Sequence, residues 1–312
     1  MLPILIIVAP VFAIIAIGCI SGRTGYLSHE AARGIGDFAF NISIPALLFK
    51  TILLARFEGV APLGILASFF GSAAVVWALS ALATRFVLKR PADDGPSIAM
   101  SAVFGNTIML GLPIGLATWG TEALAPLSVI LAVHAPVFLL SATLHAAVVD
   151  KQDDPTLLVR LAGIAQTLSR QPIIVAIFCA AMWRMTGVDL PKPMLSMLDM
   201  LAGAGVPAAL VALGLSLRNF EVRGDAATLS VMVGLKLVML PVFAAMLAFW
   251  VFKLPPVSAK MVVLTAALPA GANSYLYALR AGKAVNSASG AVAIGTAISA
   301  FTIAGLLAWF HQ

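Results

Sequence analysis

The chain has 312 residues, of which 61% are hydrophobic and only 10% are charged, and its mean hydropathy is +1.04. Soluble domains carry about 25% charged residues, so this composition cannot cover a water-exposed surface. It excludes an ordinary soluble enzyme and a disordered protein. The sequence predicts an all-α polytopic membrane protein.

The apolar residues form ten segments, most of them long enough to cross a hydrocarbon core about 30 Å thick. They lie at residues 3–21, 33–55, 61–84, 97–119, 123–148, 171–186, 193–217, 226–251, 257–280 and 287–310. The longest polar connection, 150–171, divides the chain into a first half, 1–149, and a second half, 172–312. Each half has five segments, and we expect 150–171 to be a cytoplasmic linker.

The basic residues are distributed unevenly between the two sides of the predicted membrane. Twelve Lys and Arg residues fall in the connections on one side and six on the other, with Lys236 inside the eighth segment. Basic connections favour the cytoplasm, so both termini are expected outside, on the periplasmic face of a bacterial inner membrane. This topology explains the net charge of +6, and we expect no nucleic-acid partner.

The two halves resemble each other at a constant offset, which indicates an internal repeat. The series pairs Pro10 with Pro172, Asp37 with Asp199, Pro45 with Pro207 and, after a short gap, Leu112-Pro113 with Leu268-Pro269. Because each half has an odd number of segments, the second half enters the membrane from the opposite side. The sequence therefore predicts two inverted five-helix repeats, the architecture typical of alternating access.

Two segments contain the residues that break membrane helices. The fourth carries Asn106-Thr107 followed by Gly111-Leu112-Pro113, and the ninth carries Leu268-Pro269-Ala270-Gly271 followed by Asn273. Proline and glycine interrupt the helix, and the half-helix N-termini with neutral amide side chains suit an anionic substrate. The alternative is that the asparagines only satisfy the unwound backbone. The candidate substrate-binding residues are Asn41, Asn106, Thr107, Pro113, Pro269, Asn273, Ser274 and Tyr275.

A charged residue inside a membrane segment costs about 2.5–3.5 kcal/mol on insertion scales, and three such residues are candidates for a role there. Asp37 and Asp199 each precede a proline by eight residues, and Lys236 lies deep in the eighth segment. They are candidates for ion coupling or for structural support. One interpretation is proton coupling through an aspartate, and the other is a static Asp–Lys pair. The coupling ion, proton or sodium, stays open.

The sequence offers no motif of an enzyme. It contains no HExxH zinc motif, no GxSxG nucleophile turn and no Walker A loop, so it predicts no catalytic residue, metal site or cofactor. Cys19 and Cys179 lie far apart in apolar segments and are interpreted as small hydrophobic residues.

The two broken segments resemble the crossover motifs of the auxin efflux carrier family, which includes bacterial malonate and malate permeases and plant auxin exporters. The first motif is similar to the stretch from Asn106 to Pro113, and the second to Ala267–Asn273. The sequence Gly-Ala-Asn-Ser-Tyr around Asn273 is closer to bacterial members. The long cytoplasmic loop of the plant exporters has only Asp150–Gln171 in its place.

This resemblance implies a fold like that of bile-acid symporters and sodium–proton antiporters, with a panel-like scaffold domain and a moving crossover domain. It implies that the second, seventh and both broken helices hold the substrate. The expected function is secondary-active transport or uniport of a small organic anion, a mono- or dicarboxylate or an auxin-like acid. The expected partners are that anion and the lipid bilayer, and a homodimer stays open.

Two alternatives remain at this level. One is a sodium-coupled symporter of the bile-acid type, which would be expected to show a richer cluster of acidic and polar residues. The other is a membrane sensor that binds an anion without moving it. Such a sensor would keep the binding breaks but gain nothing from an inverted repeat.

Overall fold

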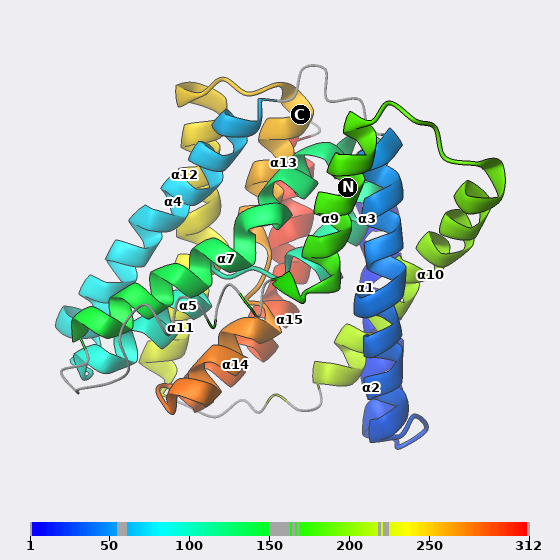
Figure 1. Ribbon diagram of the computed structural model, residues 1–312. Coiled ribbons are helices and arrows are strands. Elements are labelled where there is room, and N and C mark those ends of the chain that lie inside the picture. The colour runs from blue at the N-terminus through cyan, green and yellow to red at the C-terminus, as the bar shows by residue number, and fades with distance from the viewer. Residues whose placement is uncertain are drawn as a thin grey trace. The chain divides into compact units, whose positions relative to one another are not determined.

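The computed structural model describes residues 2–54, 61–149, 163, 166, 169–217, 220 and 225–310 (Figure 1). In these residues the regular structure is helical, and no strand forms. Six helical stretches are long and apolar enough to cross a membrane: His29–Leu54, Pro62–Val87, Thr107–Val149, Lys192–Leu217, Ala226–Val251 and Val285–Phe310. Shorter apolar helices cover Ala9–Arg23, Pro172–Met185 and Pro256–Ala267.

These helices follow the apolar segments closely. The predicted segment 171–186 is the helix Pro172–Met185, and the segment 226–251 is the helical stretch Ala226–Val251. The all-helical membrane class is therefore confirmed, whereas ten membrane crossings in two inverted repeats stay a prediction. The predicted linker 150–171 lies almost entirely outside the described residues.

The chain packs into two compact units, and each takes helices from both halves of the sequence. Unit 1 comprises Met1–Val60, Ile108–Ala132 and Leu168–Asn219, and unit 2 comprises Ala61–Thr107, Val133–Thr167 and Phe220–Gln312. The halves describe the sequence repeat, whereas the units describe which helices pack together.

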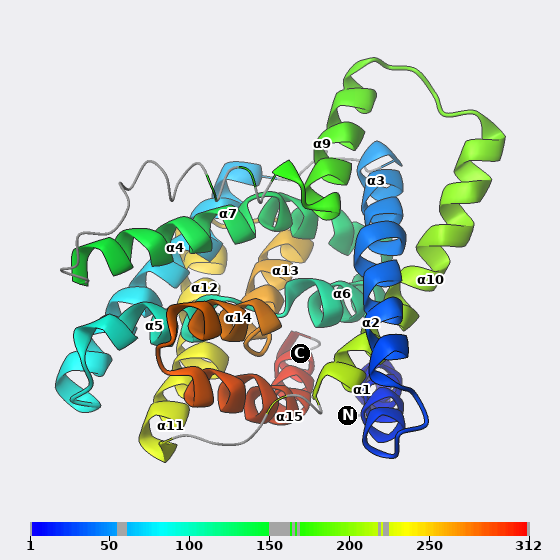
Figure 2. The same cartoon turned by 60° about the horizontal axis from the view of Figure 1, so that its bottom comes forward.

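Unit 1 is built around a close crossing of two helices. Its elements are α1 (Leu2–Arg23), α2 (His29–Phe38), η1 (Ala39–Ser43), α3 (Ile44–Leu54), α6 (Leu112–Trp119), η5 (Gly120–Ala123), the start of α7 (Leu124–Val149), α9 (Pro172–Met185) and α10 (Lys192–Leu217). Helices α1 and α10 pack along each other (Figures 1 and 2). A Cβ at Gly214 would lie 2.1 Å from the carbonyl oxygen of Ile15, so only glycine fits there.

Unit 2 contains the most buried helices of the chain. Its elements are α4 (Pro62–Leu82), η2 (Ala83–Val87), η3 (Ala92–Asp94), α5 (Gly95–Val103), the rest of α7, α11 (Ala226–Gly234), η6 (Leu235–Met239), α12 (Leu240–Ala245), η7 (Met246–Val251), α13 (Pro256–Ala267), α14 (Ala272–Ala281) and α15 (Val285–Phe310). Every residue of α5 is buried, and so are the residues from Met261 to the end of α13. The Gly, Ala and Ser residues among them let neighbouring helices approach, and α14 packs against α5 (Figure 2).

Several prolines coincide with widened helical turns. The π-helical turns η1, η4 (Thr107–Gly111) and η6 each end two residues before a proline. These prolines are Pro45, Pro113 and Pro241. A proline cannot donate to the carbonyl four residues earlier and clashes with it, so a wider turn accommodates the ring.

The first helix break lies beside Asn106, several residues before Pro113. The fourth segment is interrupted at Phe104–Asn106, between α5 and η4, whereas Pro113 is the second residue of α6. Proline is tolerated in the first turn of a helix, where its missing N–H would be unpaired in any case. Pro113 therefore belongs to the second half of the broken helix, and the break itself lies at Phe104–Asn106.

Candidate functional site

The two helix breaks meet inside unit 2. Helix α5 ends at Val103 and α13 ends at Ala267, and the extended residues that follow them lie side by side, with Gly105 bridged antiparallel to Ala270. The N–H of Asn106 donates to the carbonyl of Pro269 at 2.9 Å, and the N–H of Gly271 donates to the carbonyl of Phe104 at 2.9 Å. Each break thus supplies the hydrogen-bond partner that a backbone group of the other break would otherwise lack. Unpaired backbone groups are costly in an apolar environment.

The close approach at this crossing depends on glycine. A Cβ on Gly271 would lie 3.1 Å from the carbonyl oxygen of Gly105, which is tighter than most contacts of a real Cβ. A Cβ on Gly105 would lie 3.3 Å from the ammonium nitrogen of Lys236. The glycines therefore let the two backbones meet and let the Lys236 side chain reach them.

Lys236 places a positive charge at the crossing. Its side chain extends from η6, is 1% exposed, and its Nζ donates to the carbonyl oxygen of Ala266 at 2.8 Å. That carbonyl lies in the last turn of α13, where the helix dipole is negative, and α5 also ends beside this ammonium. Within the described residues Lys236 has no ion pair, so an Asp–Lys pair at this lysine is not what the structure shows.

Asn106 and Thr107 stand at the start of the second half of the first broken helix. Asn106 is 7% exposed, and its side-chain amide has no hydrogen-bond partner among the described residues. The hydroxyl of Thr107 donates to the carbonyl of Gly105 at 3.2 Å and lies 3.4 Å from Nε2 of His134. A buried amide without a protein partner is a group that a ligand can satisfy.

His134, on α7, was not among the candidate residues but lies beside Thr107. It is buried, and its ring centroid lies 4.4 Å from that of Phe104 and 4.9 Å from that of Phe138, both edge-on. Its aromatic surroundings agree with packing as its main role. A histidine in the middle of an apolar segment was the only signal that could have pointed to this neighbour of the crossing.

The second broken helix resumes as α14, whose first turn carries three candidates. Asn273 is exposed, and the buried hydroxyl of Ser274 donates to the carbonyl of Gly271 at 2.8 Å. The ring of Tyr275 packs edge-on against Phe220, with centroids 5.3 Å apart. The first N–H groups of α14 have no partner within the helix and carry partial positive charge. An anion beside this turn would meet N–H donors and the Asn273 amide.

The other candidates belong to unit 1. Lys50 of α3 forms an ion pair with Asp199 of α10. Asn41 is exposed on the π-helical turn η1, and Asp37 is exposed near the end of α2. Pro113 is buried in α6. The structure thus gives Asp199 a lysine partner, 149 residues away in the sequence, that sequence reasoning had not paired with it.

The chemistry at the crossing favours an anion. Residues 95–107 and 256–281 contain no Asp or Glu, while Lys236 and the half-helix N-termini supply positive charge. Within the part of the chain that the structure describes, no group of three His, Cys, Asp or Glu side chains could hold a metal ion.

Comparison with known proteins agrees with a transport function. A protein of Rhizobium meliloti named "Putative malonate transporter" is 25% identical over 302 residues, which cover 96% of this chain and 94% of that protein. An "Uncharacterized transporter" of Methanothermobacter thermautotrophicus is 24% identical over 308 residues, covering 94% of this chain and 93% of that protein. A mouse "Lysosomal cholesterol signaling protein" is 27% identical over 106 residues, 33% of this chain and 12% of that protein.

The family described as "Membrane transport protein" matches residues 3–307, nearly the whole chain. That match extends through both broken helices, so it includes the crossing and the residues around it. The resemblance to auxin efflux carriers is confirmed, and the chain belongs to this family of membrane transport proteins.

Proposed function

We propose that this chain is a secondary transporter of a small organic anion, a mono- or dicarboxylate, which binds where the two broken helices cross in unit 2. The observation that carries the proposal is the buried amide of Asn106, which lies at the crossing without a hydrogen-bond partner among the described residues. The oxygens of a carboxylate can accept hydrogen bonds from the Asn106 amide. A ligand that leaves this amide unpaired binds more weakly, by the free energy of that hydrogen bond.

The charges around the crossing support an anion over a cation. The ammonium of Lys236 is buried, and no carboxylate occurs in the residues of the two broken helices. Buried positive charge of this kind attracts an anion more strongly than it would in water, because the surroundings screen little. The N-terminal turn of α14 adds N–H donors, as half-helix N-termini do in transporters with broken helices.

The proposal includes a topology and a mechanism. The ten apolar segments would cross an inner membrane as two inverted five-helix repeats, with both termini outside and the substrate exposed alternately to each side. In support, each half of the sequence interrupts its fourth segment at a corresponding position, and inverted repeats are the usual origin of alternating access.

A dicarboxylate of malonate size is the first substrate to test. The relative from Rhizobium carries malonate in its name and aligns over almost its whole length, which makes malonate a reasonable probe. Two carboxylates could engage two donor sets at once, and the crossing offers Asn106 and the first turn of α14.

Counterflow in proteoliposomes tests transport itself. Vesicles containing the purified chain are loaded with unlabelled malonate, and the transient uptake of labelled malonate is measured against empty vesicles and against a panel of mono- and tricarboxylates. Transient accumulation identifies a carrier. Thermal stabilisation by the same acids without any counterflow would instead identify an anion sensor, and uptake that requires sodium would favour a bile-acid-type symporter.

A further inference from the structure

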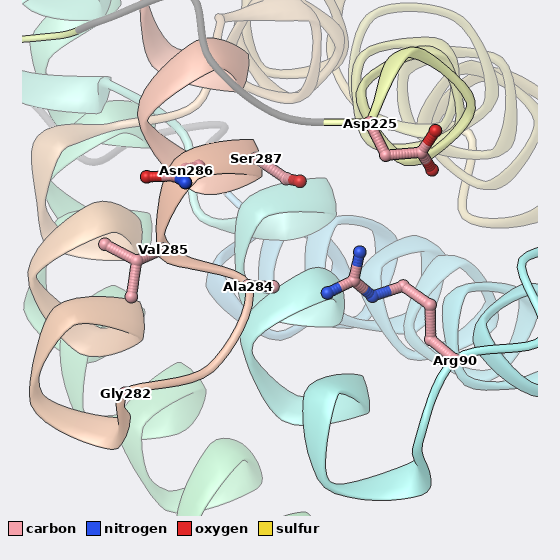
Figure 3. A pocket seen from close by; sticks show the side chains of 7 residues that line it. All are labelled: Arg90, Asp225, Gly282, Ala284, Val285, Asn286 and Ser287. Carbon is pink, nitrogen blue, oxygen red and sulfur yellow. The ribbon is translucent and has the colours of Figure 1, made fainter.

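A cavity lies in unit 2 between the end of α14 and the start of α15. Its volume is about 370 Å³, within the range of about 300–1,000 Å³ typical of small-molecule sites. It is lined by Arg90, Asp225, Gly282, Ala284, Val285, Asn286 and Ser287 (Figure 3). None of these residues takes part in the crossing.

The N-terminus of α15 forms one wall of this cavity. Helix α15 has 26 residues and no acidic residue in its first turn, so its positive end is not neutralised from within. The chain enters the helix through Ala284, whose φ of +50° is unusual for a residue other than glycine. This sharp entry leaves Ser287 of the first turn facing the cavity, whereas the Asn286 amide points away from Arg90 (Figure 3).

Ser287 is an independent sign of a ligand. Ser287 is only 3% exposed and lines the cavity, yet its hydroxyl has no hydrogen-bond partner among the described residues. In Figure 3 the hydroxyl oxygen points into the space between α15 and Arg90. Because this hydroxyl faces the cavity and donates to no protein group among the described residues, an acceptor bound in the cavity can take its hydrogen bond.

Arg90 provides the charge on the opposite wall. Its Nε donates to Asp94 at 2.8 Å, which fixes the direction of the guanidinium, while its two terminal amino groups have no partner among the described residues. In Figure 3 these amino groups point toward the α15 side of the cavity. A guanidinium held in this way can donate two parallel hydrogen bonds to one anion.

The carboxylate of Asp225 is already engaged by its own helix. It accepts hydrogen bonds from the N–H groups of Ala227 and Thr228 and from the hydroxyl of Thr228. These bonds, that of the Thr228 hydroxyl first, hold the pKa of Asp225 below its ordinary value. Asp225 therefore serves as the N-cap of α11, and its charge also attracts the Arg90 guanidinium. Arg90 donates no hydrogen bond to Asp225, so its terminal amino groups and the α15 terminus can still donate to an anion.

We propose that this cavity binds a phosphate group, carried either by a soluble phosphate or by the headgroup of an anionic phospholipid. A helix N-terminus combined with arginine and serine donors matches the several acceptor oxygens of a phosphate. The expected topology places this end of unit 2 at the cytoplasmic face, where both sources are present.

Binding of two probes tests the site and separates its sources. Inorganic phosphate is titrated calorimetrically onto the full-length chain in a neutral detergent, and native mass spectrometry counts phosphatidic acid retained by protein taken from mixed phosphatidylcholine vesicles. Arg90→Gln and Ser287→Ala should each weaken phosphate binding or lipid retention about tenfold or more, the loss expected for a hydrogen bond to a charged group. Loss of phosphate binding in both variants identifies a soluble ligand, and loss of retained phosphatidic acid in both identifies a lipid.

Matched control variants distinguish binding in this cavity from nonspecific electrostatic attraction of the probes to the protein. Arg85→Gln removes the same charge on η2 without touching the cavity, and Ser299→Ala removes a hydroxyl of α15 that already donates to Thr296. Both should bind as the wild type does. Asn106→Ala should also keep phosphate binding, because the crossing is a separate site. The proposal is overturned if neither probe binds, if Arg85→Gln weakens binding as much as Arg90→Gln, or if Asn106→Ala abolishes it.

Discussion

The ammonium of Lys236 donates a hydrogen bond to the carbonyl oxygen of Ala266 at 2.8 Å, and both residues are buried. The carbonyl belongs to the last turn of α13, immediately before the chain becomes extended. Helix C-termini leave carbonyls unpaired and carry partial negative charge, so a cation at this point stabilises the break. Lys236 thus supports the backbone of the crossing as well as supplying its positive charge.

Lys236→Met should destabilise the chain, because methionine keeps the length and apolar stem of the side chain but leaves the Ala266 carbonyl unpaired. The expected loss is about 1–3 kcal/mol of unfolding free energy, measured by chemical denaturation in detergent. Lys260→Met is the control: Lys260 also donates to a backbone carbonyl, that of Phe310, but is only partly buried. Equal stability of Lys236→Met and the wild type would show that the ammonium is not needed at the break.

Gly214→Ala should destabilise unit 1, because the added methyl group would lie 2.1 Å from the carbonyl oxygen of Ile15 and 2.8 Å from the backbone nitrogen of Cys19. Helices α1 and α10 must then separate, at a cost of about 1–3 kcal/mol. Gly203→Ala, on the same helix, meets nothing within 4 Å and should be neutral or slightly stabilising. Thermal unfolding of the two variants compares them, and equal midpoints would mean that the helix crossing is not tightly packed.

The positions of the helices and of the second break could be read from the sequence, because they depend on local composition. The break after Ala267 follows from Pro269 and Gly271, which lie within it. The first break was harder to place, since Pro113 lies at the second position of a helix, where proline is tolerated, and Gly105 forms the actual crossing. Composition alone does not tell on which side of a proline the backbone opens.

The partners of the charged residues could not be read from the sequence. Lys236 binds a backbone carbonyl 30 residues away, and Lys50 binds a carboxylate 149 residues away. Such contacts depend on which helices pack together, and the two compact units cut across the halves that the repeat suggested. The cavity at Arg90 and Ser287 is equally non-local, since its walls come from three separate connections.

The ion pair between Lys50 and Asp199 predicts different roles for the two membrane aspartates. Asp199→Asn should lower thermal stability, and the charge swap of Lys50→Asp with Asp199→Lys should restore it, because the pair would be remade. Asp37→Asn should leave stability unchanged.

If the carrier imports its anion with protons, Asp37→Asn should abolish accumulation driven by a pH step and spare exchange of labelled substrate. Normal pH-driven accumulation in Asp37→Asn would exclude Asp37 as the coupling residue.

The ion pair between Asp93 and Lys283 predicts an acid-dependent contribution to stability. The hydrogen bond from Lys283 holds the pKa of Asp93 below its ordinary value of 3.8. Because the folded-state pKa is depressed, the contribution is present above about pH 3.8 and is lost as the pH falls through the folded-state pKa. The stability difference between wild type and Asp93→Asn should therefore shrink on acidification below pH 3.8. A difference that does not change with pH would contradict an ionised Asp93.

The affinity for malonate of Asn106→Ala and Asn273→Ala, measured by calorimetry on the purified chain, tests the binding site most directly. Each variant should bind at least about tenfold more weakly than the wild type, because a hydrogen bond to a charged ligand contributes about 1.5–3 kcal/mol. Ser299→Ala, whose hydroxyl is occupied within α15, should bind normally and confirm that the protein is intact. Wild-type affinity in both asparagine variants would show that these amides only support the backbone and that the anion binds elsewhere.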